Sequence, residues 1–256
     1  MKVVIQYNKP IVWSIAGYDP TGGAGVLADV KTFEQNGVLG MAFLSSTTIQ
    51  KENEFLSVDW KNSQEIIAQI QPIAEDYEVS VAKIGIIESL AALREVIFYL
   101  KSNFPEIKIV WDPILSASSG FELIEAKLSE ELKEVLSMID LITPNVHEAR
   151  RLVGCDDEIE AAFQLGEYSA VLLKGGHSSI RLGVDLLIEH KIPYEIIGSP
   201  EAIDCSPKHG SGCILSAAIA SNLALGFDLK ESCKNAKVYI EKRLMSNKNL
   251  LAYHVT

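Results

Sequence analysis

The residues with the clearest chemical meaning form the glycine-rich run 209–213, HGSGC. This run leads directly into a helical pattern at 214–225, so successive backbone N–H groups can converge at a helix amino end, which binds phosphate and other oxyanions. Cys213 would lie in the first turn, where the positive helix end can depress the pKa of its thiol and make it a proton acceptor. The structural alternative is a small buried residue that only packs. We expect an oxyanion site built from Gly210, Ser211, Gly212 and Cys213.

Two further side chains could place charge beside a bound anion. Asp112 follows a β-branched run and precedes Pro113, which disfavours helix at Asp112, so its carboxylate could hold Mg²⁺ through water. Lys174 closes an apolar run and precedes two glycines, where an ammonium could pair with nucleotide phosphates. The ordinary alternatives are an aspartate–proline turn and a lysine whose stem covers a strand end.

Asn145 and Glu148 follow another apolar run, three residues apart. At that spacing both side chains can project from the first turn of a helix toward one point. The alternative is a capping box, with Asn145 as N-cap and Glu148 as its partner.

A second glycine-rich run, 17–25 (GYDPTGGAG), lies between an apolar run and a helical pattern. Its glycines would let the backbone approach a ligand closely. No Gly-Lys-Ser/Thr follows, and the glycine spacing differs from the dinucleotide fingerprint. Asp29, just beyond, is by itself typical of a solvated helix residue.

The elements that must position these residues alternate along the chain. Short apolar runs with the length of buried strands occur at 11–16, 41–48, 81–86, 107–111, 139–142 and 170–173. Helical spacing occurs between them at 24–35, 64–74, 90–102, 128–137 and 158–165. The alternation predicts an α/β fold with a mainly parallel sheet and helices on both faces, and ligands of such folds bind beyond the carboxyl ends of the strands.

The last third of the chain has a different pattern. Runs at 184–188 and 194–197 predict a β-hairpin, and 211–225 and 229–245 predict two helices. No Ser/Gly linker, charge block or internal repeat is present, so we expect a single domain over residues 1–256.

Composition excludes several classes of function. Lys plus Arg total 23 against 34 Asp plus Glu, which argues against a nucleic-acid or anionic membrane surface. No apolar run reaches membrane-spanning length, and residues 1–10 lack the apolar core of a signal peptide. The four cysteines show neither zinc-site spacing nor the density of a disulfide scaffold, which favours a cytoplasmic protein.

Together, these motifs resemble those of the hydroxymethylpyrimidine/phosphomethylpyrimidine kinase family, a branch of the ribokinase-like superfamily that also contains pyridoxal kinases. The resemblance spans nearly the whole chain. It rests on the order and spacing of motifs at 15–25, 28–33, 83–85, 112–113, 141–149, 174–177 and 209–213. It implies a ribokinase-like three-layer αβα sandwich.

The implied activity is transfer of the γ-phosphoryl group of ATP, with Mg²⁺, to 4-amino-5-hydroxymethyl-2-methylpyrimidine and then to its monophosphate, in thiamine biosynthesis. The resemblance assigns the pyrimidine site to Gly17, Asp29, Gln50 and Ile86. It assigns the Mg-ATP region to Asp112, Asn145, Glu148 and Lys174, with Asp112 and Glu148 at the metal. Much of the superfamily carries an aspartate base where this branch carries cysteine, so Cys213 is expected to accept or polarise the hydroxyl proton.

The sequence departs from the family pattern at two places. Residues 204–208 lack the usual Asn-Thr pair before the glycine-rich run, and Pro207 there cannot donate an N–H. Ser211 replaces a threonine, and Gln50 is followed by Lys-Glu-Asn rather than Asn-Thr. These departures bear on lid contacts and on the second phosphorylation.

Three alternatives remain at this point. Pyridoxal kinase shares the scaffold and the oxyanion loop. A non-catalytic pyrimidine sensor would have little need for Asp112, Asn145, Glu148, Lys174 and Cys213 together. A sugar kinase would carry the aspartate that is absent here. The resemblance also implies a homodimer.

Overall fold

One mainly parallel sheet organises the computed structural model, which describes residues 7–115, 128–178, 182–199 and 205–255. Within these residues nine strands lie in the order β3-β2-β1-β4-β5-β6-β7-β8-β9. The strands are β1 (Ile11–Tyr18), β2 (Leu39–Lys51), β3 (Glu54–Trp60), β4 (Val81–Ile84), β5 (Lys108–Trp111), β6 (Leu141–Ile142), β7 (Ala170–Leu173), β8 (Asp185–Glu189) and β9 (Ile192–Ile196). Strands β2, β1, β4, β5, β6 and β7 are parallel, whereas β3, β8 and β9 run antiparallel to their neighbours.

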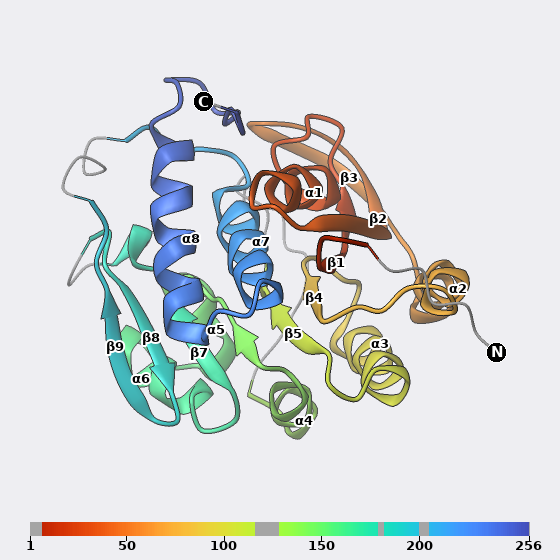
Figure 1. Cartoon of the computed structure of the whole chain (residues 1–256). Helices are drawn as coiled ribbons and strands as arrows, with labels where there is room; N and C mark the ends of the chain where they lie inside the picture. The colour runs from red at the N-terminus through yellow and green to blue at the C-terminus, as the bar shows by residue number, and fades with distance from the viewer. Residues whose placement is uncertain (1–6, 116–127, 179–181, 200–204, 256) are drawn as a thin grey trace.

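Helices cover both faces of this sheet. One face carries α1 (Gly25–Gln35), α7 (Ser211–Ala224) and α8 (Leu229–Leu244). The other face carries α2 (Ser63–Ala74), α3 (Leu90–Asn103), α4 (Glu130–Met138), α5 (Val146–Val153) and α6 (Glu158–Leu165). Figure 1 shows α7 and α8 side by side in front of the sheet. The predicted three-layer α/β architecture is confirmed.

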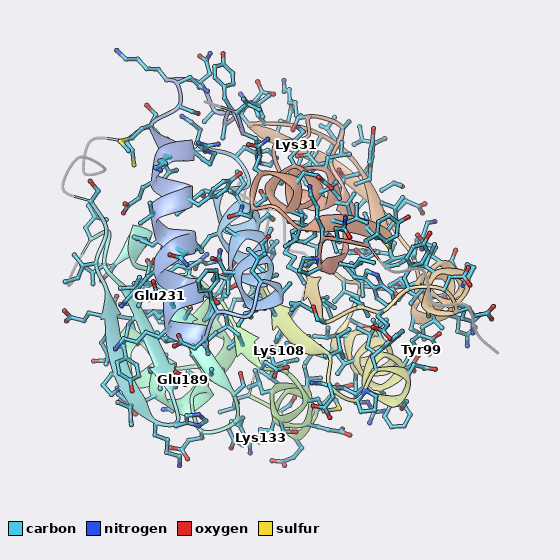
Figure 2. The ribbon with its side chains drawn as sticks, in the orientation of Figure 1. Lys31, Tyr99, Lys108, Lys133, Glu189 and Glu231 are labelled. Atoms are coloured by element: carbon cyan, nitrogen blue, oxygen red, sulfur yellow. The ribbon has the colours of Figure 1, made fainter. Side chains whose placement is uncertain are left out.

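The central strands are buried on both faces of the sheet, which explains why their apolar runs could be predicted as strands from the sequence. Adjacent residues of β1 belong to different cores: Val12 packs under α1 and α7, and Trp13 packs against the opposite helical layer. Both side chains are fully buried, so apolar residues are favoured on both faces of the strand and not at every second position alone. The polar exception is Ser14, whose hydroxyl donates to Asp29. Charged side chains occupy the outer helices, as Figure 2 shows for Lys133 on α4 and Glu231 on α8.

The sheet edges differ from the sequence prediction. Strand β3 was not predicted. It is an edge strand without a fully buried residue, and its residues are exposed or half-buried. The predicted hairpin is confirmed, but its turn is His190 and Lys191, which have φ values of 51° and 65°, and Pro193 lies inside β9. The last strand tolerates proline because an outward-facing N–H has no partner there.

Among the residues that the structure describes, no helix combines the length and apolarity needed to cross a membrane. The cytoplasmic location and the single domain over 1–256 stay predictions.

Candidate active site

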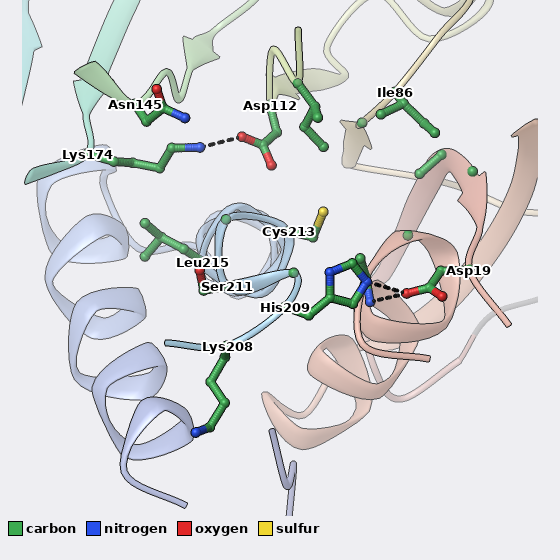
Figure 3. Close-up of a pocket in the computed structure, with 18 of the residues that line it drawn as sticks. Asp19, Ile86, Asp112, Asn145, Lys174, Lys208, His209, Ser211, Cys213 and Leu215 are labelled. Carbon is green, nitrogen blue, oxygen red and sulfur yellow. Dashed lines mark hydrogen bonds and ion pairs between the residues drawn. The ribbon is translucent and has the colours of Figure 1, made fainter. Parts of the chain in front are cut away.

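A cavity of about 840 Å³ lies at the carboxyl ends of the parallel strands. It collects residues that follow β1, β2, β4, β5, β6 and β7, together with the first turn of α7. The predicted site residues that line it are Gly17, Gln50, Ile86, Asp112, Asn145, Glu148, Lys174, Gly210, Ser211, Gly212 and Cys213. Figure 3 shows Lys174, Asp112 and Ile86 across the opening from Ser211, Cys213 and His209. Asp29 alone among the predicted residues does not line the cavity.

The oxyanion loop enters α7 through a left-handed glycine. Gly210 is the N-cap with φ 74°, and α7 begins at Ser211, so the first-turn amides have no partner within the helix. A Cβ atom at position 210 would lie 2.0 Å from the carbonyl oxygen of Gly23. The loop thus contacts the first glycine-rich run directly, and only glycine permits that contact.

Replacing Gly210 by alanine is therefore expected to lower both stability and turnover. The left-handed conformation alone costs about 1–2 kcal/mol for a residue with a Cβ, and relief of the clash with Gly23 must displace the loop amides. The matched control is Gly154→Ala, because Gly154 has φ 72° but open space around its Cβ position. Urea unfolding and kcat would be measured for both variants. Equal losses of stability and kcat in Gly210→Ala and Gly154→Ala would show that the contact with Gly23 contributes to neither.

Three buried charged groups meet beside this loop. Lys174 Nζ lies 2.8 Å from Asp112 Oδ1 and 3.7 Å from Glu148 Oε2. Burial would raise the pKa of Asp112, but the ammonium groups of Lys174 and Lys83 hold it below its ordinary value. Burial, aided by the Asp112 charge and opposed by Lys174, raises the pKa of Glu148 to about 7. Glu148 is therefore the carboxylate of this cluster that can change charge near neutral pH.

The capping alternative for Asn145 and Glu148 is also realised. The backbone N–H of Asn145 donates to Glu148 Oε2 at 2.7 Å, and the N–H of Glu148 donates to Asn145 Oδ1 at 2.9 Å. The cap fixes the Glu148 carboxylate, and the same oxygen faces Lys174. One capping box therefore both starts α5 and aims a carboxylate into the cavity.

Asp112 and Glu148 can bind a magnesium ion, but the ion needs further oxygen ligands from a bound substrate and water. Within the described residues, no group of three or more His, Cys, Asp or Glu could hold a metal. Asp112 and Glu148 supply two carboxylates on either side of Lys174. Mg²⁺ is commonly bound by one or two carboxylates plus substrate phosphates and water. This pair suits an ion brought in with nucleotide phosphates.

The thiol of Cys213 does not have the depressed pKa expected from its place at a helix amino end. Its side chain is 5% exposed. Burial raises the pKa of Cys213 to about 11, with the Lys83 charge and a hydrogen bond from the Gly25 N–H opposing that rise. Desolvation thus outweighs the Lys83 charge and the Gly25 hydrogen bond, and the resting group at neutral pH is the thiol.

The expected contact of Asp29 with a ligand is not supported by its position. Its carboxylate is fully buried, accepts from Ser14 Oγ at 2.6 Å and binds Lys83 Nζ at 2.8 and 3.0 Å. Burial raises the pKa of Asp29 despite these partners. Lys83, not Asp29, lines the cavity. Lys83 could have been found from the sequence, because it is a lysine inside the otherwise apolar strand β4.

Two other cavity residues were missed. His209 Nε2 lies 2.8 Å from Asp19 Oδ2, a pair drawn in Figure 3. Asp19 also accepts from the N–H groups of Thr21 and Ala24 at 2.9 Å each. Burial alone would raise the pKa of Asp19. The hydrogen bonds from His209, Thr21 and Ala24 together outweigh burial and hold that pKa below its ordinary value. The pair joins the two glycine-rich runs, 190 positions apart.

The other end of the cavity is lined by an amide and by apolar side chains. A Cβ atom at Gly17 would lie 2.5 Å from Ile86 Cδ1 and 2.7 Å from Ser46 Oγ. Gln50 lies at a register shift in the β2–β3 pairing, opposite Phe55, and both residues line the cavity. Gly17, Gln50, Phe55 and Ile86 line this end of the cavity, called the slot below. Gly17 packs so closely against Ile86 and Ser46 that a side chain at position 17 would displace them.

Comparison with known proteins identifies the family of this chain. The phosphomethylpyrimidine kinase family model matches residues 19–256. The hydroxymethylpyrimidine/phosphomethylpyrimidine kinase of Aquifex aeolicus is 34% identical over 254 residues, covering 94% of this chain and 96% of that protein. The crystal structure of phosphomethylpyrimidine kinase from Clostridium difficile has a TM-score of 0.73 and 31% identity, over 91% of this chain and 99% of that one.

Pyridoxal kinases share the same architecture. The ADP complex of the Bacillus subtilis pyridoxal kinase has a TM-score of 0.81 and 27% identity, covering 93% of each chain. The predicted ribokinase-like fold is thus confirmed by both kinds of kinase. Since the family model covers nearly the whole chain and a curated relative exceeds 30% identity at nearly full length, the chain belongs to the phosphomethylpyrimidine kinase family.

Proposed function

We propose that this protein transfers the γ-phosphoryl group of ATP to the hydroxymethyl oxygen of 4-amino-5-hydroxymethyl-2-methylpyrimidine, and then to the resulting monophosphate, in thiamine biosynthesis. One observation carries the proposal: a single cavity joins the slot at Gly17 and Gln50 to the oxyanion loop and the Lys174 cluster. Family membership gives the chemistry, and the cavity gives both substrates a place at one site.

At the nucleotide end, the residues act by positioning and by neutralising charge, which are the main needs of phosphoryl transfer. Lys174 would bind the phosphates, and the amides of 210–213 would bind the transferred group. Asp112 and Glu148 would hold Mg²⁺, and the ion would neutralise phosphate charge. Asn145 orients Glu148 through the capping box.

At the pyrimidine end, Gln50 would recognise the ring because its amide offers both donors and acceptors. Gly17 and Ile86 would set the width of the slot. Cys213 lies between the two ends and would accept the hydroxyl proton as the oxygen bonds to phosphorus. The raised pKa of Cys213 makes this step depend on pH.

Pyridoxal phosphorylation is the second candidate, because the Bacillus subtilis pyridoxal kinase superposes with a TM-score of 0.81. Pyridoxal is also a flat heteroaromatic alcohol and would enter the same slot. A homodimer stays a prediction for either activity.

The deciding experiment measures ATP consumption by the purified protein with Mg²⁺, offering hydroxymethylpyrimidine, its monophosphate and pyridoxal separately. Products would be resolved by mass. Turnover of both pyrimidines is the expected result. Turnover of pyridoxal alone would move the assignment to pyridoxal kinase, and tight pyrimidine binding without product would make the protein a sensor.

A further inference from the structure

One hydrogen bond fastens the oxyanion loop to the first glycine-rich run. His209 Nε2 lies 2.8 Å from Asp19 Oδ2, and the two side chains are 11% and 2% exposed. The same carboxylate accepts from the backbone N–H groups of Thr21 and Ala24 at 2.9 Å each. Because an ionised carboxylate only accepts hydrogen bonds, His209 Nε2 must be the donor. A single carboxylate therefore holds both glycine-rich runs.

Local structure gives little reason for a histidine at position 209. Asp19 already has three donors in its own run, the N–H groups of Thr21 and Ala24 and the hydroxyl of Thr21. The Nδ1 atom of His209 is buried and has no hydrogen-bond partner among the described residues. A buried polar atom without a partner costs about 1–3 kcal/mol, which an apolar side chain would avoid. The imidazole needs an explanation other than stability.

The pair lies between the two groups that the reaction must align. Asp19 belongs to the run that carries Gly17 of the slot, and this run folds back so tightly that a Cβ atom at Gly25 would lie 2.1 Å from the Gly17 carbonyl oxygen. His209 directly precedes Gly210, the N-cap of α7. Figure 3 shows the imidazole of His209 pointing toward Asp19. The hydrogen bond therefore sets the distance between the slot and the oxyanion amides.

The backbone of the oxyanion loop is fixed separately, by the last residues of the chain. The N–H of His209 donates to the Leu250 carbonyl at 2.9 Å, and Lys208 donates to the Asn247 carbonyl at 2.7 Å. Neither bond uses the imidazole, so both remain when the side chain at position 209 is replaced. Such a replacement releases the loop from the first glycine-rich run alone.

We propose that Asp19 and His209 are positioning residues: their hydrogen bond fixes the oxyanion loop against the first glycine-rich run, so that the amides of 210–213 meet the phosphoryl group as it is transferred to the alcohol in the slot. Both residues act through the loop, and neither takes part in the bonds that form and break. The inference rests on the proposed function for the identity of the alcohol. Misplacement by about 1 Å can cost about 10²-fold in rate, so a small movement of the loop is enough for a large effect.

The test compares two uncharged replacements of His209. Glutamine can still donate an amide N–H to Asp19, whereas leucine cannot donate at all. We expect His209→Leu to lower kcat by about 10²-fold, with KM for ATP within about twofold of the wild-type value. His209→Gln should recover most of the lost kcat. A merely structural role predicts neither this rescue nor a change confined to kcat.

A binding measurement tests the same point without pyrimidine turnover. Titration calorimetry would follow the binding of ADP and Mg²⁺, first alone and then with aluminium fluoride, which imitates the phosphoryl group in transfer. His209→Leu should bind ADP and Mg²⁺ as the wild-type protein does. It should lose about 10²-fold of the tightening caused by aluminium fluoride, because a transition-state mimic loses affinity in parallel with rate. His209→Gln should keep most of this tightening.

The matched control is His254→Leu. His254 is half-buried, its Nδ1 lies 3.5 Å from Tyr239 Oη, and it does not line the cavity, so its loss should leave kcat and aluminium fluoride binding unchanged. If His209→Leu does not fold, His209→Asn takes its place in the comparison with glutamine, because its shorter amide cannot reach Asp19.

Two results would overturn the proposal. One is wild-type kcat and wild-type tightening by aluminium fluoride in folded His209→Leu. The other is an equal loss in the leucine and glutamine variants. Absence of pyrimidine turnover in the wild-type protein would instead overturn the proposed function, and the aluminium fluoride comparison would still decide the role of His209.

Discussion

Replacement of Lys174 by methionine is expected to lower kcat/KM for pyrimidine phosphorylation by about 10²–10³-fold, the range found when one preorganised donor to a developing charge is removed. The ammonium of Lys174 is fixed by Asp112 at 2.8 Å, and a Cβ atom at Gly212 in the oxyanion loop would lie only 3.1 Å from it. It is thus positioned where transferred phosphate would bind. Steady-state ADP release at varied ATP concentration measures the loss.

Stability must be separated from catalysis in this variant. Removing one partner of a buried pair costs about 3–5 kcal/mol because the remaining charge is uncompensated, and here Asp112 and Glu148 would both remain. Lys174→Met/Glu148→Gln removes one of the two carboxylates and should recover part of that stability without recovering turnover. Lys101→Met is the control, because it breaks a lysine–aspartate pair at the amino ends of the strands, away from the cavity. Turnover near the wild-type rate in folded Lys174→Met would contradict the assigned role.

The sequence predicted the part of the site that follows from strand order. Asp112, Asn145, Lys174 and the run 209–213 each follow a predicted strand or open a predicted helix, and parallel strands end at one edge. The structure brings them to one cavity for that reason. The central strands were equally readable, because burial on both faces requires continuous apolar runs. The edge strand β3 has no such requirement and was missed.

The remaining parts of the site depend on contacts that no local pattern contains. The pairs Asp19–His209 and Asp29–Lys83 join residues 190 and 54 positions apart, so their partners could not be named from spacing. The pKa of Cys213 depends on how completely the fold covers the thiol, which a helix-end argument leaves out.

The atypical segment before the oxyanion loop is held by the end of the chain. Lys208 is buried and donates to the Asn247 carbonyl at 2.7 Å, and the N–H of His209 donates to the Leu250 carbonyl at 2.9 Å. Pro207 stood out in the sequence because it cannot donate an N–H, but the contacts of this segment with Asn247 and Leu250 were not predicted. Residue 204, which belongs to the same departure, lies outside the described residues.

Replacement of Cys213 by alanine is expected to lower kcat by about 10²–10⁴-fold, the usual contribution of a positioned general base. The pH dependence is the sharper result. Since the pKa of Cys213 is raised to about 11, the thiolate fraction of the wild-type protein grows about tenfold for each pH unit below that value. Between pH 8 and 9, above the pKa of about 7 of Glu148, kcat/KM of the wild-type protein should therefore rise with pH, and that of Cys213→Ala should not.

Serine provides the test that separates chemistry from packing. Cys213→Ser nearly preserves the size of the side chain, but its hydroxyl stays protonated over the whole range, so its loss of rate and its flat pH profile should match those of alanine. Cys233→Ala is the matched control: Cys233 is a buried thiol of α8 whose pKa burial also raises, and it lies in the core rather than at the cavity. It should lose stability without a change in the pH profile. A wild-type pH slope in Cys213→Ala would show that another group takes the proton.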